Sequence, residues 1–260
     1  MPNVITLTFY IYLLHNKYNI NIIKIIPTTS MSSDDINYHT AKVVLIGKSG
    51  VGKTSIISRF TSDKFDPDTL SSLGASFVSK EIFFPEINNT IKFDIWDTAG
   101  QEKYRSLAKI FYKDAVVIIL VYDITKADSF TEIMEYWLDE IKANSNKNAI
   151  LALAANKEDL YNEATISEKE GQMYADTIGA IFKRTSALSN VGIDEFFQLI
   201  GKKYLNPSYD YKAEEQKLKE EYMRAKMEGD DAFVPHDAGM KLNDTNGTTK
   251  KSKGKCGNCL

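Results

Sequence analysis

The sequence predicts an α/β fold: a six-stranded, mostly parallel, doubly wound sheet with helices on both faces. Three observations predict it. Short apolar segments rich in β-branched residues alternate with segments whose apolar residues recur at three- and four-residue steps. Two of the short segments, 115–122 and 149–155, are almost continuously apolar, as in strands covered on both faces. Residues 47–54 form a glycine-rich loop between an expected strand and an expected helix.

Six segments have the length and residue types of strands, namely Ala41–Ile46, Phe77–Phe84, Thr90–Trp96, Ala115–Tyr122, Ala149–Ala155 and Ala180–Lys183. The second and third are joined by P-E-I-N-N at 85–89, which favours a hairpin. This pair is therefore expected to be antiparallel within an otherwise parallel sheet.

Four core helices are expected between or after these strands. The first begins near Lys53, and the third opens with a capping box at Ser167 and Glu170 and stops near Gly179. The second has a clear apolar stripe made by Phe130, Ile133, Met134, Trp137, Leu138 and Ile141. The last carries Ile193, Phe196, Phe197, Leu199 and Ile200.

These elements place the α/β domain at 39–206, after an N-terminal extension (1–38) and before a charged helix (207–228) and a basic tail (229–260) that is predicted to be disordered. Residues 1–30 lack the basic start and the cleavage site of a signal peptide. The sequence M-S-S-D-D at Met31 resembles a natural start, so the residues before it are interpreted as mispredicted upstream sequence or a disordered extension. A segment that lies on a membrane stays an alternative.

Charge and cysteine content narrow the function classes. The net charge of −3 argues against a nucleic-acid partner, because such proteins usually carry a strong basic bias. The chain has 2 cysteines, Cys256 and Cys259, both at its end. The predicted domain therefore contains no disulfide and fits a reducing cytosol.

Residues 47–54 read G-K-S-G-V-G-K-T and match the phosphate-loop pattern G-x-x-x-x-G-K-[ST]. Backbone N–H groups of such a loop face an anion, the lysine reaches the β- and γ-phosphates, and the threonine hydroxyl is a ligand for Mg²⁺. The predicted nucleotide-binding residues here are Ser49, Gly50, Val51, Gly52, Lys53, Thr54 and Ser55. The alternative is a glycine-rich turn without a ligand.

The sequence D-T-A-G-Q begins at Asp97, directly after the third expected strand. An aspartate in that place is expected to hold Mg²⁺ through water, opposite Thr54. Gly100 offers a backbone N–H to the γ-phosphate, and Gln101 has the donor and the acceptor needed to orient an attacking water. Lys53 and Gln101 are the predicted catalytic residues.

The sequence N-K-E-D at 156–159 follows the fifth expected strand and predicts the base. Asp159 would accept hydrogen bonds from N1–H and the 2-amino group of guanine, and would stay buried and unpaired against adenine, at a cost of about 1–3 kcal/mol or more. Asn156 belongs to the same predicted set, and the Lys157 stem would lie along the base. The other predicted base contacts are Ser186, Ala187 and Leu188, through a backbone N–H toward O6, and Phe65, which is alternatively an ordinary core residue.

These four motifs, in this order, resemble those of the Ras-like small GTPases over residues 39–206. Within that superfamily the chain is similar to the Rab family, on the stretches L-G-A-S-F (73–77), K-F-D-I-W-D-T-A-G-Q-E (92–102), Y-R-S-L (104–107) and L-V-Y-D-I-T (120–125). G-A-S-F and Y-R-S-L-A are most like the early-endosomal branch. The resemblance implies that Phe77, Trp96 and Phe111 form the aromatic triad read by effectors.

The resemblance implies a GTP/GDP switch with Mg²⁺ on the cytoplasmic face of an endomembrane, endosomal by preference, acting in vesicle trafficking. Its implied partners are an exchange factor, a GTPase-activating protein, a GDP-dissociation inhibitor or escort protein, and GTP-state effectors. Ser72 stands where most members have the threonine that ligates Mg²⁺; it keeps the hydroxyl and lacks a methyl group worth at most about 0.8 kcal/mol. No arginine lies between Arg59 and Arg105 to act as an internal arginine finger, so hydrolysis is expected to be slow without the activating protein.

The chain ends with lysines around Cys256 and Cys259, followed by Leu260, and does not satisfy the C-a-a-X pattern. Lipidation of one or both cysteines, supported by the lysines, is expected to anchor the protein. A zinc or redox C-x-x-C is the competing interpretation. Alternative functions are a non-Rab Ras-like signalling GTPase, a scaffold that binds GTP without cycling, and an adenine-using kinase or ATPase, which Asp159 disfavours.

Overall fold

The computed structural model describes residues 36–68, 75–98, 105–214, 216–217 and 220. The chain divides into two units, one made of 31–216 and the other of the two ends of the chain. The description below concerns the first unit. Among the described residues, no helix combines the length and the apolarity needed to cross a membrane.

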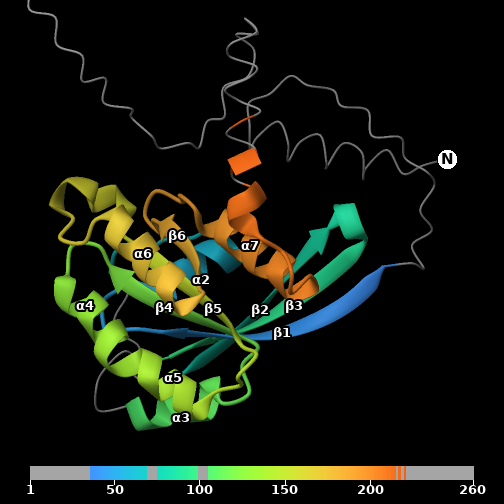
Figure 1. The fold of residues 1–260 in the computed structure, drawn as a ribbon, viewed down its shortest axis with the longest axis horizontal. Helices are drawn as coiled ribbons and strands as arrows, with labels where there is room; N and C mark the ends of the chain where they lie inside the picture. Colours follow the sequence, from blue (N-terminus) through green and yellow to red (C-terminus); the bar gives the residue numbers. More distant parts are fainter. Residues whose placement is uncertain (1–35, 69–74, 99–104, 215, 218–219, 221–260) are drawn as a thin grey trace, which may run out of the picture. The chain divides into compact units, whose positions relative to one another are not determined.

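The core of this unit is a six-stranded sheet with the strand order β2-β3-β1-β4-β5-β6 (Figure 1). Its strands are β1 (Asn37–Ile46), β2 (Ser76–Phe84), β3 (Asn89–Asp97), β4 (Val117–Asp123), β5 (Ile150–Asn156) and β6 (Ile181–Thr185). β2 pairs with β3 antiparallel across the short helix η2 (Pro85–Ile87), and every other neighbouring pair is parallel. The predicted fold class is confirmed, including the hairpin.

Helices cover both faces of the sheet (Figure 1). α2 (Lys53–Ser62) and α7 (Ile193–Leu205) pack on one face, with the odd-numbered core residues of β1 and β4. The other face carries α3 (Arg105–Tyr112), the continuous helix α4-η4-α5 (Ala127–Asn144) and α6 (Glu168–Ile178), with the even-numbered residues. β4 and most of β5 are buried on both faces, as their continuous apolar segments predict.

Two differences from the predicted elements stand out, while the ends of the other strands shift by one or two residues. β1 begins at Asn37 rather than Ala41, because its polar first residues pair in register with the start of β3. The expected helix over 130–141 has a wider π-type turn at its centre, η4 (Ile133–Trp137), between α4 (Ala127–Glu132) and α5 (Leu138–Asn144). The Trp137 indole donates to Glu132 Oε1 at 3.0 Å across this turn. The spacing of apolar residues is compatible with an α-helical or a π-helical turn, so it does not predict the π-type turn at η4.

The capping box predicted for α6 is present: the Glu170 N–H bonds to Ser167 Oγ, and the Glu170 carboxylate accepts from the Ser167 N–H. Gly179 ends the helix in the left-handed conformation, as predicted. Two further predicted segments, 1–35 of the extension and the tail 229–260, lie outside the described residues.

The α2–α7 contact is an aromatic stack. The rings of Phe60 and Phe197 lie 3.6 Å apart between centroids, with 6° between their planes, and Phe93 of β3 meets both rings edge-on. All three are buried. This stack fixes α2, the helix that continues from the glycine-rich loop, against α7, the last helix of the domain.

Replacing Phe197 by alanine is expected to lower the free energy of unfolding by about 3–5 kcal/mol, because it removes a buried ring and leaves a cavity under α2. Urea unfolding followed by circular dichroism measures this. Phe83→Ala, on the edge strand β2 with 47% of the residue exposed, is the matched control and should cost far less. Equal losses for the two variants would contradict the prediction.

Candidate functional site

Five parallel strands end at one edge of the sheet, and a polar segment follows each of them. The glycine-rich loop follows β1, Asp97 and Asp123 close β3 and β4, Asn156 closes β5, and Ser186 follows β6. Ligands of doubly wound sheets bind at this edge. The residues predicted from separate motifs are therefore brought to one place.

Two glycines of the loop after β1 lie so close to neighbouring atoms that a side chain would not fit. Gly52 has φ +97°, and a Cβ there would lie 2.4 Å from Asn156 Nδ2. At Gly47, with φ +151°, a Cβ would lie 2.2 Å from the Val121 carbonyl oxygen. Glycine is thus required at both positions, by conformation and by space.

The Lys53 side chain curls back over its own loop. Its Nζ donates to the carbonyl oxygens of Gly47 at 2.7 Å and Lys48 at 3.1 Å, and the residue is buried. Burial lowers the pKa of Lys53 to about 8, although the charges of Asp97 and Glu132 act in the opposite direction. A desolvated ammonium that is held only by neutral carbonyl oxygens in these two bonds favours an anion such as a phosphate.

Two of the predicted metal ligands touch each other. Thr54 Oγ1 donates to Asp97 Oδ2 at 2.6 Å, and Thr98 Oγ1 fastens the end of β3 to the Leu45 carbonyl oxygen at 2.7 Å. Hydroxyl and carboxylate oxygens are the ligands that Mg²⁺ prefers, so the donor set fits this ion beside a phosphate. The third predicted ligand, Ser72, the predicted γ-phosphate contact Gly100 and the predicted catalytic residue Gln101 lie outside the described residues.

Asn156 connects the base side of the site to the phosphate side. Its Nδ2 donates to the Val51 carbonyl oxygen at 2.7 Å, and its Oδ1 accepts from Thr185 Oγ1 at 3.2 Å. All three residues are buried. Asn156 therefore spans from β5 to the loop after β1, across the intervening β4.

Lys157 has a left-handed backbone, φ +68°, and its Nζ forms an ion pair with Asp123 Oδ2 at 2.7 Å. Burial raises the pKa of Asp123, but hydrogen bonds from Lys157 and Thr125 outweigh it, so the pKa lies below its usual value. The carboxylate thus stays charged and holds the lysine stem in place. Motif reasoning missed this role of Asp123, although an aspartate that closes a fully apolar strand was a visible signal.

Asp159 is exposed and accepts a hydrogen bond from Ser186 Oγ, which also accepts from the Ser189 N–H at 3.0 Å. Of the neighbouring predicted residues, Ala187 is buried and Leu188 is 53% exposed. Phe65 is half-buried and packs against the core cluster of α2 and α7. The carboxylate and the loop after β6 are thus held together, with the carboxylate open to a ligand.

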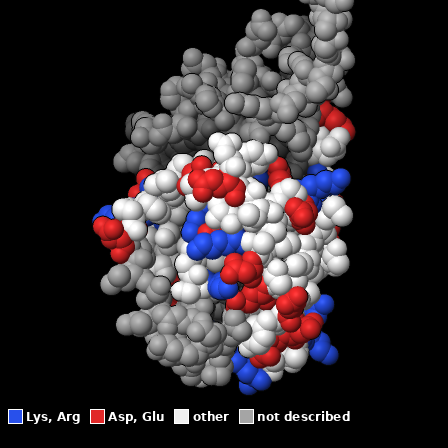
Figure 2. All heavy atoms as spheres, turned by 90° about the vertical axis from the view of Figure 1, so that its left-hand side faces the viewer, with Lys and Arg blue, Asp and Glu red and all other residues white. Residues whose placement is uncertain are grey.

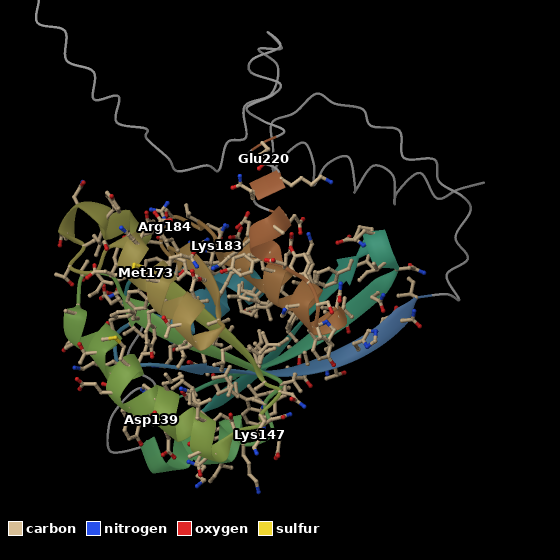
Figure 3. All side chains as sticks on the ribbon, viewed as in Figure 1. Asp139, Lys147, Met173, Lys183, Arg184 and Glu220 are labelled. Atoms are coloured by element: carbon tan, nitrogen blue, oxygen red, sulfur yellow. The ribbon has the colours of Figure 1, made fainter. Side chains whose placement is uncertain are left out.

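Ion pairs support the short helix η5 (Glu158–Glu163), which carries Asp159. Arg184 of β6 lies 2.8 Å from Glu158 and 3.3 Å from Glu168 at the start of α6. Acidic and basic side chains adjoin one another over the face shown in Figure 2, and Figure 3 labels Arg184 beside Lys183. Arg184 thereby links the segment after β5 to β6 and α6.

The three residues predicted to face effectors form a continuous aromatic group. The rings of Phe77 and Trp96 lie 5.1 Å apart, and those of Trp96 and Phe111 5.3 Å apart. Phe77 is 51% exposed on the edge strand β2. The structure therefore brings together residues from β2, β3 and α3.

Replacing Asn156 by alanine should lower the free energy of unfolding of nucleotide-free protein by about 2–4 kcal/mol, because the buried Val51 carbonyl and Thr185 hydroxyl both lose their partner. Urea unfolding in EDTA without added nucleotide separates this effect from ligand binding. Asn144→Ala, which removes a half-buried amide that donates only to Glu140 in the preceding turn of α5, is the control and should change stability by about 1 kcal/mol or less. A loss no larger than the control's would contradict the role given to Asn156.

Comparison with known proteins agrees with this geometry. The Ras family matches residues 42–206. The chain is similar to Ras-related protein Rab-22A of Homo sapiens, with 42% identity over 169 residues, 65% of this chain and 84% of that protein. It is also similar to Ras-related protein Rab-31 of Mus musculus (44% over 161 residues, 62% and 81%) and to Ras-related protein RHN1 of Nicotiana plumbaginifolia (41% over 174 residues, 66% and 85%). The chain therefore belongs to the Ras family and is a small GTPase of the Rab type.

Proposed function

We propose that this GTPase binds GTP and GDP with Mg²⁺ and acts as a slow switch on an endomembrane. The observation that carries the proposal is that the glycine-rich loop after β1 and the Asp159 carboxylate lie at the same edge of the sheet. Asn156 joins the two halves through the Val51 carbonyl, and Ser186 holds the Asp159 carboxylate to the loop after β6. Both halves of a guanine nucleotide are thus provided for by separate elements.

On the phosphate side, Lys53 supplies positive charge, and the backbone of residues 49–55 supplies N–H donors. Thr54 and Ser72, with Asp97 acting through water, would hold Mg²⁺, which supplies charge neutralisation on the phosphates when bound. Gly100 would meet the γ-phosphate, and Gln101 would orient the attacking water. The contact between Thr54 and Asp97 supports the first part of this assignment.

Hydrolysis by this site is expected to be slow, on the order of 10⁻⁴–10⁻³ s⁻¹, as in GTPases that lack an internal arginine finger. No arginine occurs between Arg59 and Arg105 in the sequence. The charge that develops in the transition state would then be stabilised by an activating protein. The reaction serves as a timer that returns the switch to its GDP state.

On the base side, Asp159 would accept both guanine donors, the Lys157 stem would lie along the ring, and a backbone N–H of the loop at 186–188 would face O6. Phe65 stays a proposed contact to the other ring face. Its position against the core does not favour this role over ordinary packing. Selectivity for guanine then rests on Asp159.

The trafficking role and the membrane attachment rest on similarity and on the tail. Relatives with Rab names support vesicle trafficking, and the G-A-S-F and Y-R-S-L-A stretches favour an endosomal membrane. Lipids on Cys256, Cys259 or both would anchor the chain, aided by the lysines before them. An exchange factor, an activating protein, a GDP-dissociation inhibitor or escort protein and effectors that contact Phe77, Trp96 and Phe111 complete the proposed cycle.

The direct test is the nucleotide content of the purified protein, followed by competition of GTP, GDP and ATP for the site with Mg²⁺ present. We expect bound GDP or GTP, displaced by either guanine nucleotide and not by ATP. Protein that holds no guanine nucleotide, or that exchanges it equally for ATP, would refute the proposal. Bound GTP that is never hydrolysed, even with candidate activating proteins, would point to a non-cycling scaffold.

Asp159→Asn is expected to weaken GDP binding about tenfold to a hundredfold and to strengthen binding of XDP, because an amide can donate to the 2-carbonyl of xanthine where a carboxylate cannot. Competition titrations with GDP and XDP measure both changes. Asp176→Asn, on α6, removes an acidic group that pairs with Lys212 and should leave both affinities unchanged. A loss of GDP binding without any gain for XDP would contradict the direct role of Asp159.

The intact mass of the C-terminal peptide, isolated from the protein's own cells, should exceed the unmodified mass by one or two isoprenoid chains. The Cys256→Ser and Cys259→Ser variants would assign the modified residue. The double variant should lose membrane association in cell fractionation. An unmodified peptide would refute lipid anchoring while leaving the nucleotide assignment untouched.

A further inference from the structure

Arg59 connects two parts of the site that the sequence motifs do not link. It lies in the last turn of α2, the helix that begins at Lys53, and its side chain is only 14% exposed. The nucleotide motifs give it no role. Its guanidinium nevertheless points to the loop after β6, which is remote in the sequence.

The guanidinium makes four contacts in a fixed fork. Arg59 Nε donates to the Ala187 carbonyl oxygen at 2.9 Å, and Nη2 donates to the Leu188 carbonyl oxygen at 3.3 Å. Nη1 donates to the carbonyl oxygen of Asp63 at 3.0 Å and to its carboxylate Oδ1 at 2.9 Å. A planar guanidinium can hold several acceptors in one arrangement, which a single ammonium cannot do.

The loop after β6 also contacts Asp63 directly. Asn190 Nδ2 donates to Asp63 Oδ1 at 3.1 Å, so Asp63 is held by Arg59 from one side and by the loop from the other. Asp63 and Asn190 both have left-handed backbones, with φ +52° and +56°. The end of α2 and the loop therefore form one fastened unit.

The same loop reaches the base-reading carboxylate. Ser186 and Val191 exchange backbone hydrogen bonds that close the loop, and Ser186 Oγ donates to Asp159. Arg59 holds the carbonyl of Ala187, beside the backbone N–H groups proposed to face guanine O6. A continuous chain of contacts thus runs from α2 to the groups around guanine.

We propose that Arg59 is a positioning residue for base recognition. It fixes the loop at 186–190 against α2, so that a backbone N–H of this loop meets guanine O6. This role rests on the proposed function, because it assumes that the base side of the site binds guanine. Arg59 itself contacts no substrate. Its removal should therefore weaken the O6 contact more than the contacts of Asp159 with N1–H and the 2-amino group.

The test compares the release of GDP and of 6-thio-GDP, in which sulfur replaces O6 as a weaker acceptor while N1–H and the 2-amino group remain. Both nucleotides are loaded with Mg²⁺ and chased with excess unlabelled GDP. In the unaltered protein, GDP should leave more slowly than 6-thio-GDP. In Arg59→Gln, GDP should leave about tenfold faster, 6-thio-GDP only about twofold faster, and the difference between them should shrink.

Two further variants make the test decisive. Asn190→Gly removes the contact with Asp63 while keeping a residue that tolerates the left-handed backbone, so it should give a smaller change in the same direction even if Arg59→Gln folds poorly. Lys202→Gln breaks an ion pair with Glu214 far from this loop and should release both nucleotides at the unaltered rates.

The outcomes separate the two proposals. Equal acceleration of both nucleotides in Arg59→Gln and Asn190→Gly, or no acceleration in either variant, would overturn the role of Arg59. An unaltered protein that binds neither nucleotide would instead overturn the proposed function.

Discussion

The hydrogen bond from Asn156 to the Val51 carbonyl is the constraint on which the site depends. It joins loops that follow β1 and β5, two strands separated by β4, and it requires these loops to touch. Because the amide approaches Gly52 so closely, the glycine cannot be replaced by any larger residue without moving one of the loops. This contact thereby fixes the distance between the groups proposed to bind the phosphates and the base, and such preorganisation would lower the entropic cost of binding.

Burying the Asn156 amide does not destabilise the fold, because neighbouring groups provide hydrogen-bond partners for it. Thr185 provides the second partner, and Asp123 and Lys157 neutralise each other beside it. An unpaired polar group in this position would cost about 1–3 kcal/mol. The apolar clusters on both faces of the sheet supply the stability that such a polar edge requires, and the Phe60–Phe197 stack extends that support to α2.

The sequence was sufficient for the fold and for the separate motifs, because strands buried on both faces and a phosphate loop each have a local signature. It was insufficient for contacts between distant segments. Thr185 and Arg59 look ordinary in their local sequence, and Asp123 is conspicuous only as a charge after an apolar strand. The contacts of all three form only when the fold brings distant segments together. The π-type turn at η4 and the early start of β1 escaped for a related reason, since pairing and packing rather than residue preference decide them.

The division of the site into two halves also explains how affinity and switching can be separate properties. GTP and GDP carry the same base, so the proposed contacts at Asp159 and the loop after β6 would strengthen both complexes equally. A ligand interaction that is equal in two states shifts no equilibrium between them. Under this proposal, the base-side contacts fixed by Arg59 and Asn156 would set how long a nucleotide stays bound. The groups that face the γ-phosphate would make the protein respond to its loss. Because the base contacts would be the same in both complexes, the difference between the GTP and GDP states would depend on the γ-phosphate alone.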